Sequence, residues 1–177
     1  MHCPVCRQPP LAPTQLENGL AGLGCRDCGG VLVPVLAARQ WAETEGADGW
    51  SGHVEALALD DSSSALNCPK CGHFMCKFRI DAGIDNRLDL CGHCGEFWLD
   101  AGEWNLLGAL ELRQRLPAIF SQPWQLEIRQ RESQAERETR LRAALGDGDY
   151  ARVAEFARWL RAHPQAAQIR RHLGLQG

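Results

Sequence analysis

Two short stretches, Cys76–Ile80 and Leu88–Leu90, alternate between apolar and polar side chains. A period of two residues is typical of half-buried β-strands. The stretch between them, Asp81–Asn86, is rich in turn-forming residues. The pattern predicts a β-hairpin with one apolar face, and it places Cys76 on that face as a small core residue.

The apolar string Phe97–Leu99 is followed by a sequence that begins a helix. Asp100 and Glu103 have the spacing of a capping box, in which the first residue satisfies free N–H groups and the second bonds back to it. Apolar residues then recur to Leu116, and Pro117 cannot continue a helix. We therefore expect a helix over residues 101–116.

From Trp124 onward the chain is helical in pattern but mostly polar. Glutamate and arginine recur four residues apart, in the pairs Glu127 with Arg131, Glu136 with Arg140 and Glu138 with Arg142. Gly146 predicts a break, a second helix runs to His163 with an apolar stripe, and Pro164 begins a short third helix. Such helices are typical of a solvated arm or of a surface that contacts a partner.

Charge is distributed unevenly along the 177 residues, whose net charge is −3. Residues 1–112 hold 7 basic and 15 acidic side chains, whereas residues 113–177 hold 12 basic and 7 acidic ones. A basic tail on an acidic head fits nucleic acid, an acidic protein partner or head-to-tail self-contact, and charge alone does not choose among them.

Eight of the nine cysteines occur in four C-x-x-C pairs. The N-terminal sequence lacks the features of a signal peptide, so we expect a cytoplasmic protein, where thiols stay reduced and paired cysteines indicate metal. Nineteen residues separate the pair Cys68 and Cys71 from the pair Cys91 and Cys94, which is close to the spacing of a four-cysteine zinc site.

The N-terminal pairs form a first copy of the same unit. Cys3 precedes Cys68 by 65 residues and Cys25 precedes Cys91 by 66, which indicates an internal repeat. A unit this small needs a metal to fold. The sequence predicts two Zn²⁺ ions per chain, with ligands Cys3, Cys6, Cys25 and Cys28 in one site and Cys68, Cys71, Cys91 and Cys94 in the other.

The second copy, with CPKCG followed by CGHCGEFWLDAGEWNLL, resembles the transcription factor IIB-type zinc-ribbon family (zf-TFIIB). Its FWLDAGE string is similar to the family's W-L-D-x-G-E signature. The resemblance covers about residues 67–110 and, more weakly, 1–41, and it implies a zinc-ribbon fold with four cysteine ligands. The first copy departs from the signature at Val33–Val35, which weakens the prediction of a helix there but leaves its four cysteine ligands intact.

These patterns predict a small, metal-stabilised α+β fold. It would contain two zinc ribbons, made of short β-hairpins and knuckles, followed by an α-helical C-terminal region. We expect a degenerate first ribbon at 1–41, an acidic linker at 42–66 with a short helix near 54–59, a second ribbon with its helix at 67–116, and a helical arm at 117–177.

No catalytic chemistry is expected from these motifs. A zinc ion held by four cysteines has no open position for water or substrate. The histidines lack the H-E-x-x-H context and no G-x-S-x-G occurs. His73 and His93 lie within knuckles and are expected to pack there. A redox role is disfavoured because every C-x-x-C has a partner pair at ribbon spacing.

The function predicted from these features is that of a non-enzymatic adaptor with two structural zinc ions and a protein partner on its helical arm. Trp124, Phe156, Trp159 and Leu160 are the candidate anchors. The alternative is a nucleic-acid-binding or transcription-associated protein, against which stand the acidic ribbon half and a pI near 6.1. A membrane partner is not expected, and the sequence does not specify an oligomeric state.

Overall fold

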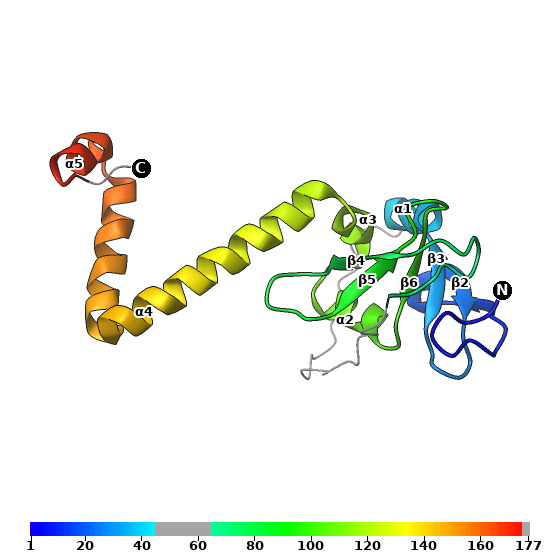
Figure 1. Ribbon diagram of the computed structural model, residues 1–177. Helices are drawn as coiled ribbons and strands as arrows, with labels where there is room; N and C mark the ends of the chain where they lie inside the picture. The colour runs from blue at the N-terminus through cyan, green and yellow to red at the C-terminus, as the bar shows by residue number, and fades with distance from the viewer. Residues whose placement is uncertain (45–64, 175–177) are drawn as a thin grey trace. The chain divides into compact units, whose positions relative to one another are not determined.

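One antiparallel sheet of six strands unites the two sequence repeats (Figure 1). The computed structural model describes residues 1–44 and 65–174. The first repeat contributes β1 (Ala12–Gln15), β2 (Ala21–Gly24) and β3 (Val31–Pro34), and the second contributes β4 (Cys76–Arg79), β5 (Arg87–Leu90) and β6 (Glu96–Leu99). The order is β1-β2-β3-β6-β5-β4. The predicted α+β class is confirmed, and the helix expected near 54–59 lies outside the described residues.

Strands β3 and β6 pair at the centre of the sheet. Their register aligns Val31 with Leu99, Leu32 with Trp98, and Val33 with Phe97. Cys25 and Cys91 are 66 positions apart in the sequence, and adding 66 to a residue number of β3 gives the equivalent residue of β6. Leu32 then corresponds to Trp98, and the Val31–Leu99 pair corresponds to the Phe97–Val33 pair. A pseudo-two-fold axis therefore passes through the Leu32–Trp98 pair and relates the two repeats.

The two faces of the central strands bury different clusters, because successive side chains of a strand point to opposite faces. Val33 and Phe97 lie on one face in the main core, which also contains Trp41, Leu107 and Ile119 from three helices. Leu32 and Trp98 lie in a second cluster with the cysteines of both C-x-x-C groups. The sheet thus separates the helical core from the cysteine sites.

The helices of the core differ from those expected. α1 (Val35–Thr44) is present although its sequence lacks a cap residue, because the Val35 N–H bonds to the carbonyl of Gly95 in the other repeat at 2.8 Å. The single helix expected over residues 101–116 is wrong. α2 (Glu103–Ala109) ends early, before Glu111, which has a φ of 57°.

A short 3₁₀ helix, η2 (Arg113–Arg115), follows α2 and leads into α3 (Leu116–Ile119). Pro117 lies in the first turn of α3, where a missing N–H costs nothing, so it starts a helix and does not end one. The predicted bond from Glu103 back to the cap residue is confirmed, since the Asp100 N–H donates to Glu103 Oε2 at 2.8 Å.

The predicted hairpin is present as β4 and β5, with Cys76 opposite Leu90 and Phe78 opposite Leu88. Cys76 itself is exposed, and the prediction of a core position is wrong. It is the first residue of β4, and β4 is an outer strand of the sheet, so its side chain lies beyond the covered part of the apolar face. Lys77 and Asp89 form a 2.9 Å ion pair on the opposite face.

The beginning of α4 (Gln122–Ala162) covers the outer edge of β4. The Gln125 amide accepts from the Arg79 N–H at 3.2 Å and donates to the Arg79 carbonyl at 2.9 Å, as a neighbouring strand would. Trp124 Nε1 donates to the carbonyl of Ile80 at 3.0 Å. Trp124 therefore anchors the helix to the sheet and is not free for a partner.

The C-terminal part of the chain consists of the remainder of α4 and of α5 (Ala166–His172). The break predicted at Gly146 is confirmed, since its φ of 75° and ψ of 160° are not helical. Residues 1–130 form one compact unit, and a second begins at Arg131. Within the second unit the predicted Glu136–Arg140 pair forms at 3.1 Å. Among the described residues, no helix is both long and apolar enough to cross a membrane.

Gly30→Ala tests the packing of the two repeats against each other. A Cβ atom at Gly30 would lie 2.2 Å from Trp98 Cζ2, so one of the two must shift. We expect a loss of about 2–3 kcal/mol in the free energy of unfolding, measured by chemical denaturation. Gly92→Ala is the control, because its added Cβ has nothing within 4 Å. Equal denaturation midpoints for the two variants would contradict this packing.

Candidate metal centres

The four C-x-x-C turns share one backbone geometry. In each turn the residue four positions after the first cysteine donates its N–H to that cysteine's carbonyl at 2.8–2.9 Å. These donor residues all have a positive φ, and they are Arg7, Gly29, Gly72 and Gly95. Glycine adopts this conformation without strain, whereas Arg7 holds it with a side chain. The repeated geometry aims both sulfur atoms of each pair at a common point.

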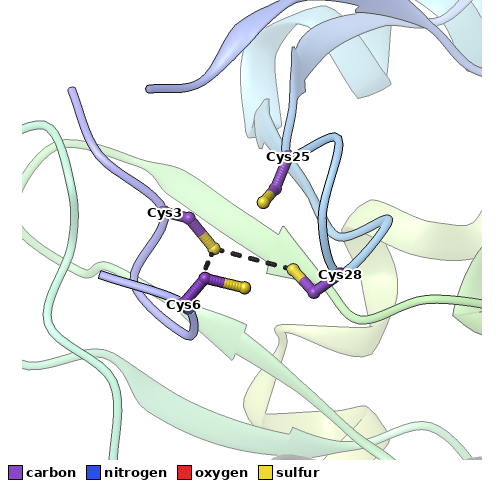
Figure 2. A group of neighbouring side chains, drawn as sticks. All are labelled: Cys3, Cys6, Cys25 and Cys28. Atoms are coloured by element: carbon purple, nitrogen blue, oxygen red, sulfur yellow. Dashed lines mark hydrogen bonds between the residues drawn. The ribbon is translucent and has the colours of Figure 1, made fainter. Parts of the chain in front are cut away.

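The first cysteine group lies at the N-terminal end of the chain (Figure 2). Cys3 and Cys6 come from the segment before β1, and Cys25 and Cys28 come from the turn between β2 and β3. Their four Sγ atoms lie within 4.8 Å of one another and converge on one centre, with Cys3 and Cys28 separated by 3.6 Å. The Cys6 N–H donates to Cys3 Sγ at 3.3 Å.

The second group has the same construction one repeat later. Cys68 and Cys71 precede β4, and Cys91 and Cys94 occupy the turn between β5 and β6. The Sγ–Sγ distances are 3.5 Å for Cys68–Cys94, 3.5 Å for Cys71–Cys91 and 3.6 Å for Cys71–Cys94. Both groups consist of the four cysteines predicted from the spacing.

These separations fit an ion-centred site. A tetrahedral ion with metal–sulfur bonds of about 2.3 Å places its sulfur ligands about 3.8 Å apart. A disulfide would require a separation of about 2.05 Å. In each group the first cysteine of both pairs is buried and the second is half-buried, so the centre is shielded from water. Each group can hold one metal ion, and four thiolates select soft metals such as zinc or iron.

The thiol pKa values follow the same pattern in both groups. Burial raises the pKa of Cys28, and it raises that of Cys94 to about 12. Burial opposes ionisation of Cys25 and Cys91 as well, but N–H groups of the following turn donate to these sulfurs and lower each pKa to about 7. One thiol of each group is thus ready to bind a metal ion at neutral pH.

Lys70 distinguishes the second group from the first, and the sequence reading missed it. Its ammonium pairs with the buried carboxylate of Glu96, and this hydrogen bond raises the Lys70 pKa, with smaller contributions from the Cys94 and Cys68 thiols. A metal ion with four thiolates carries net negative charge, which a nearby cation offsets. Val5 occupies the equivalent position of the first repeat and carries no charge, so the basic residues of that group are Arg7 and Arg26, at other positions.

The two knuckle histidines pack against each other, a contact that the sequence did not predict. The rings of His73 and His93 are stacked with centroids 4.0 Å apart and an interplanar angle of 13°. His73 Nδ1 also lies 3.3 Å from the carbonyl oxygen of Cys71. This stack joins the two knuckles of the second group on their exposed side.

Trp98 belongs to the cluster that contains cysteines of both groups, a role that the sequence did not indicate. It is fully buried in the cluster that contains Cys3, Cys25, Cys68 and Cys91. Its indole Nε1 donates to Asp100 Oδ1 at 2.7 Å. A shared neighbour of this size makes the packing of each site depend on the other.

Comparison of the chain with protein-family models, with curated proteins and with solved structures found no match. The zinc-ribbon resemblance of the second repeat therefore remains a prediction from sequence.

Metal binding should release more protons at low pH than at high pH. Metal ions bind thiolates, and Cys25 and Cys91 change from mostly protonated to mostly ionised as the pH rises through about 7. We expect about one additional proton released per ion at pH 6 relative to pH 8, and weaker binding at the lower pH. Calorimetry in buffers of different ionisation enthalpy measures this difference. Equal proton release at both pH values would contradict the lowered pKa values.

Cys91→Ser should be far more damaging than Cys76→Ala. Removing one thiolate from a buried group forfeits much of a metal-binding free energy on the order of 10 kcal/mol, whereas Cys76 is exposed and contributes about 0.5 kcal/mol or less. We expect Cys91→Ser to lose one metal ion and melt at a lower temperature, and Cys76→Ala to match the parent chain. Similar melting temperatures for the two variants would contradict the assignment.

Proposed function

We propose that the chain is a non-enzymatic zinc-ribbon adaptor in which two structural zinc ions stabilise the six-stranded head and the helical arm binds a protein partner. The observation that carries the proposal is the pair of four-cysteine groups, each with sulfur spacing suited to a tetrahedral ion. A closed set of four thiolates leaves no position for a substrate, which favours a structural role for both ions.

Zinc is favoured over iron because the sites serve folding. Each repeat alone is too small to bury an adequate core, and a redox-inert ion supplies folding free energy without further chemistry. Reduced thiols are also required, which suits a cytoplasmic location. Iron bound by the same thiolates would give the protein strong visible absorption, whereas zinc leaves it colourless.

The arm supports partner binding because it leaves large apolar side chains in solvent. Among the described residues of the second unit, Leu141, Leu145, Val153, Phe156 and Trp159 are all 40% exposed or more. Trp and Phe are frequent anchors of protein interfaces. Leu160, predicted as a further anchor, is buried and serves folding.

Deletion of residues 131–177 tests whether metal binding by the six-stranded head is independent of partner binding by the arm. This cut leaves Trp124 and Gln125 in place against the sheet, so the head retains its edge contacts. We expect the truncated chain to bind two zinc ions by elemental analysis and to lose the proteins that the full chain captures by crosslinking in its native cells.

Two results would contradict the proposal. One is capture of the same proteins by the truncated chain, which would place the interface on the head. The other is loss of captured material on nuclease treatment, which would favour the nucleic-acid alternative.

A further inference from the structure

A row of aromatic rings lines the end of α4. Phe156, Trp159 and His163 recur at helical spacing, with ring centroids 5.6 Å apart for the first two and 5.0 Å apart for the last two. Phe156 is 43% exposed and Trp159 is 50% exposed, whereas Leu160 beside them is buried. This helix end therefore uses one side for its own packing and presents the aromatic row to solvent.

The same part of the chain carries positive charge with no acidic residue. Residues 156–174 contain four arginines and two histidines and neither Asp nor Glu. Ion pairs of the arm include those of Arg140, Arg142 and Arg152. None of these pairs involves the four exposed arginines of residues 156–174, which are Arg158 and Arg161 near the end of α4 and Arg170 and Arg171 on α5.

Arg158 and Arg161 are the basic residues nearest in the chain to the aromatic row, one and two residues from Trp159 on α4. Salt screens charges over about 8 Å at physiological ionic strength, so charges this close along the chain still act on a ligand at the row. A ligand that fits it combines apolar groups for the rings with negative charge for the arginines.

Exposed aliphatic side chains of the arm distinguish between an acidic protein and a nucleic acid. Val153, one turn before Phe156, and Leu173, at the end of α5, bury well against other side chains but do not stack on bases. Glu155, one turn before Trp159, repels a phosphate backbone and a carboxylate alike and does not separate the two ligands. The aliphatic side chains therefore favour a protein surface.

We propose that the basic aromatic end of the arm, comprising Phe156, Trp159, His163 and the four arginines, binds an acidic amphipathic segment of a partner protein. The inference rests on the proposed adaptor function and specifies its partner. The aromatic row buries the apolar face of that segment, and the arginines attract its carboxylates and speed its association.

The test uses the full zinc-loaded chain and a fluorescein-labelled synthetic peptide of about 16 residues, with leucines on one helical face and glutamates elsewhere. In fluorescence anisotropy at physiological salt, we expect Trp159→Ala to weaken binding by about tenfold or more. Arg158→Glu should weaken binding by about fivefold and lower its salt dependence. Arg137→Glu is the matched control, an exposed arginine of the arm that precedes the break at Gly146 and lies outside the basic aromatic end, and should bind like the parent chain.

Three results would overturn the inference. They are equal effects of Arg158→Glu and Arg137→Glu, equal binding of a peptide with lysine in place of glutamate, and tighter binding of single-stranded oligonucleotide than of the acidic peptide. Circular dichroism of each variant separates lost binding from lost helix. If the 131–177 deletion abolishes capture in cells but Trp159→Ala and Arg158→Glu do not, the adaptor function stands and this inference falls. Capture that survives the deletion refutes the adaptor function itself.

Discussion

The pairing of β3 with β6 is the interaction on which the head of this protein depends. Each repeat alone would be a three-stranded sheet with its innermost strand unpaired, and an exposed strand edge of this kind invites association with other chains. Joining the two edges produces one sheet and places the most apolar strands at its centre, where Val33, Phe97 and Trp98 are fully buried. Other contacts between the repeats follow from this pairing. The Val35 N–H bonds to Gly95, Trp41 packs edge-on against Trp104 at 5.3 Å, and Arg113 pairs with Glu17 at 3.1 Å.

Because side chains alternate along these two strands, the two faces of the sheet contact different parts of the molecule. One face carries the helices and supplies ordinary apolar burial, with the T-shaped and tilted ring pairs of Phe120 against Phe78 and Phe97. The other face carries both cysteine groups, and among the residues that the structure describes its cluster contains no helix, only Leu32, Trp98 and a few apolar neighbours such as Leu66 and Met75. A cluster of this size buries little surface, so this face has the greater need of bound metal ions. The ions would supply there what the helices supply on the other side.

The sequence predicted the structure best where the structure depends on residues that are close together in the chain. Cysteine spacing identified both groups of four, because a C-x-x-C turn is a local structure and the repeat supplied the pairing. Alternation identified β4 and β5, and glycine identified the break at Gly146. Long-range contacts decided the rest. α1 obtains its first hydrogen bond from Gly95, and Cys76 lies at an uncovered edge. No local pattern predicts that β3 pairs with β6. Both strands are mostly apolar, so their sequences show burial but not the identity of the neighbouring strand.

The two repeats are related by a pseudo-two-fold axis, yet their differences are complementary. Trp98 reaches across the axis to Gly30, which leaves room for the indole ring because it has no side chain. The counterpart of Gly30 in the second repeat is Glu96, and the counterpart of Trp98 in the first is Leu32. If two second repeats paired with each other, Glu96 of one would take the place of Gly30 beside Trp98 of the other. Even an added Cβ atom is too close to the indole at that place, and Glu96 would no longer have room to pair with Lys70. A small residue in one copy and a large one in the other therefore favour pairing within one chain over pairing between like repeats. This asymmetry gives the two diverged units of one polypeptide a packing reason to pair with each other.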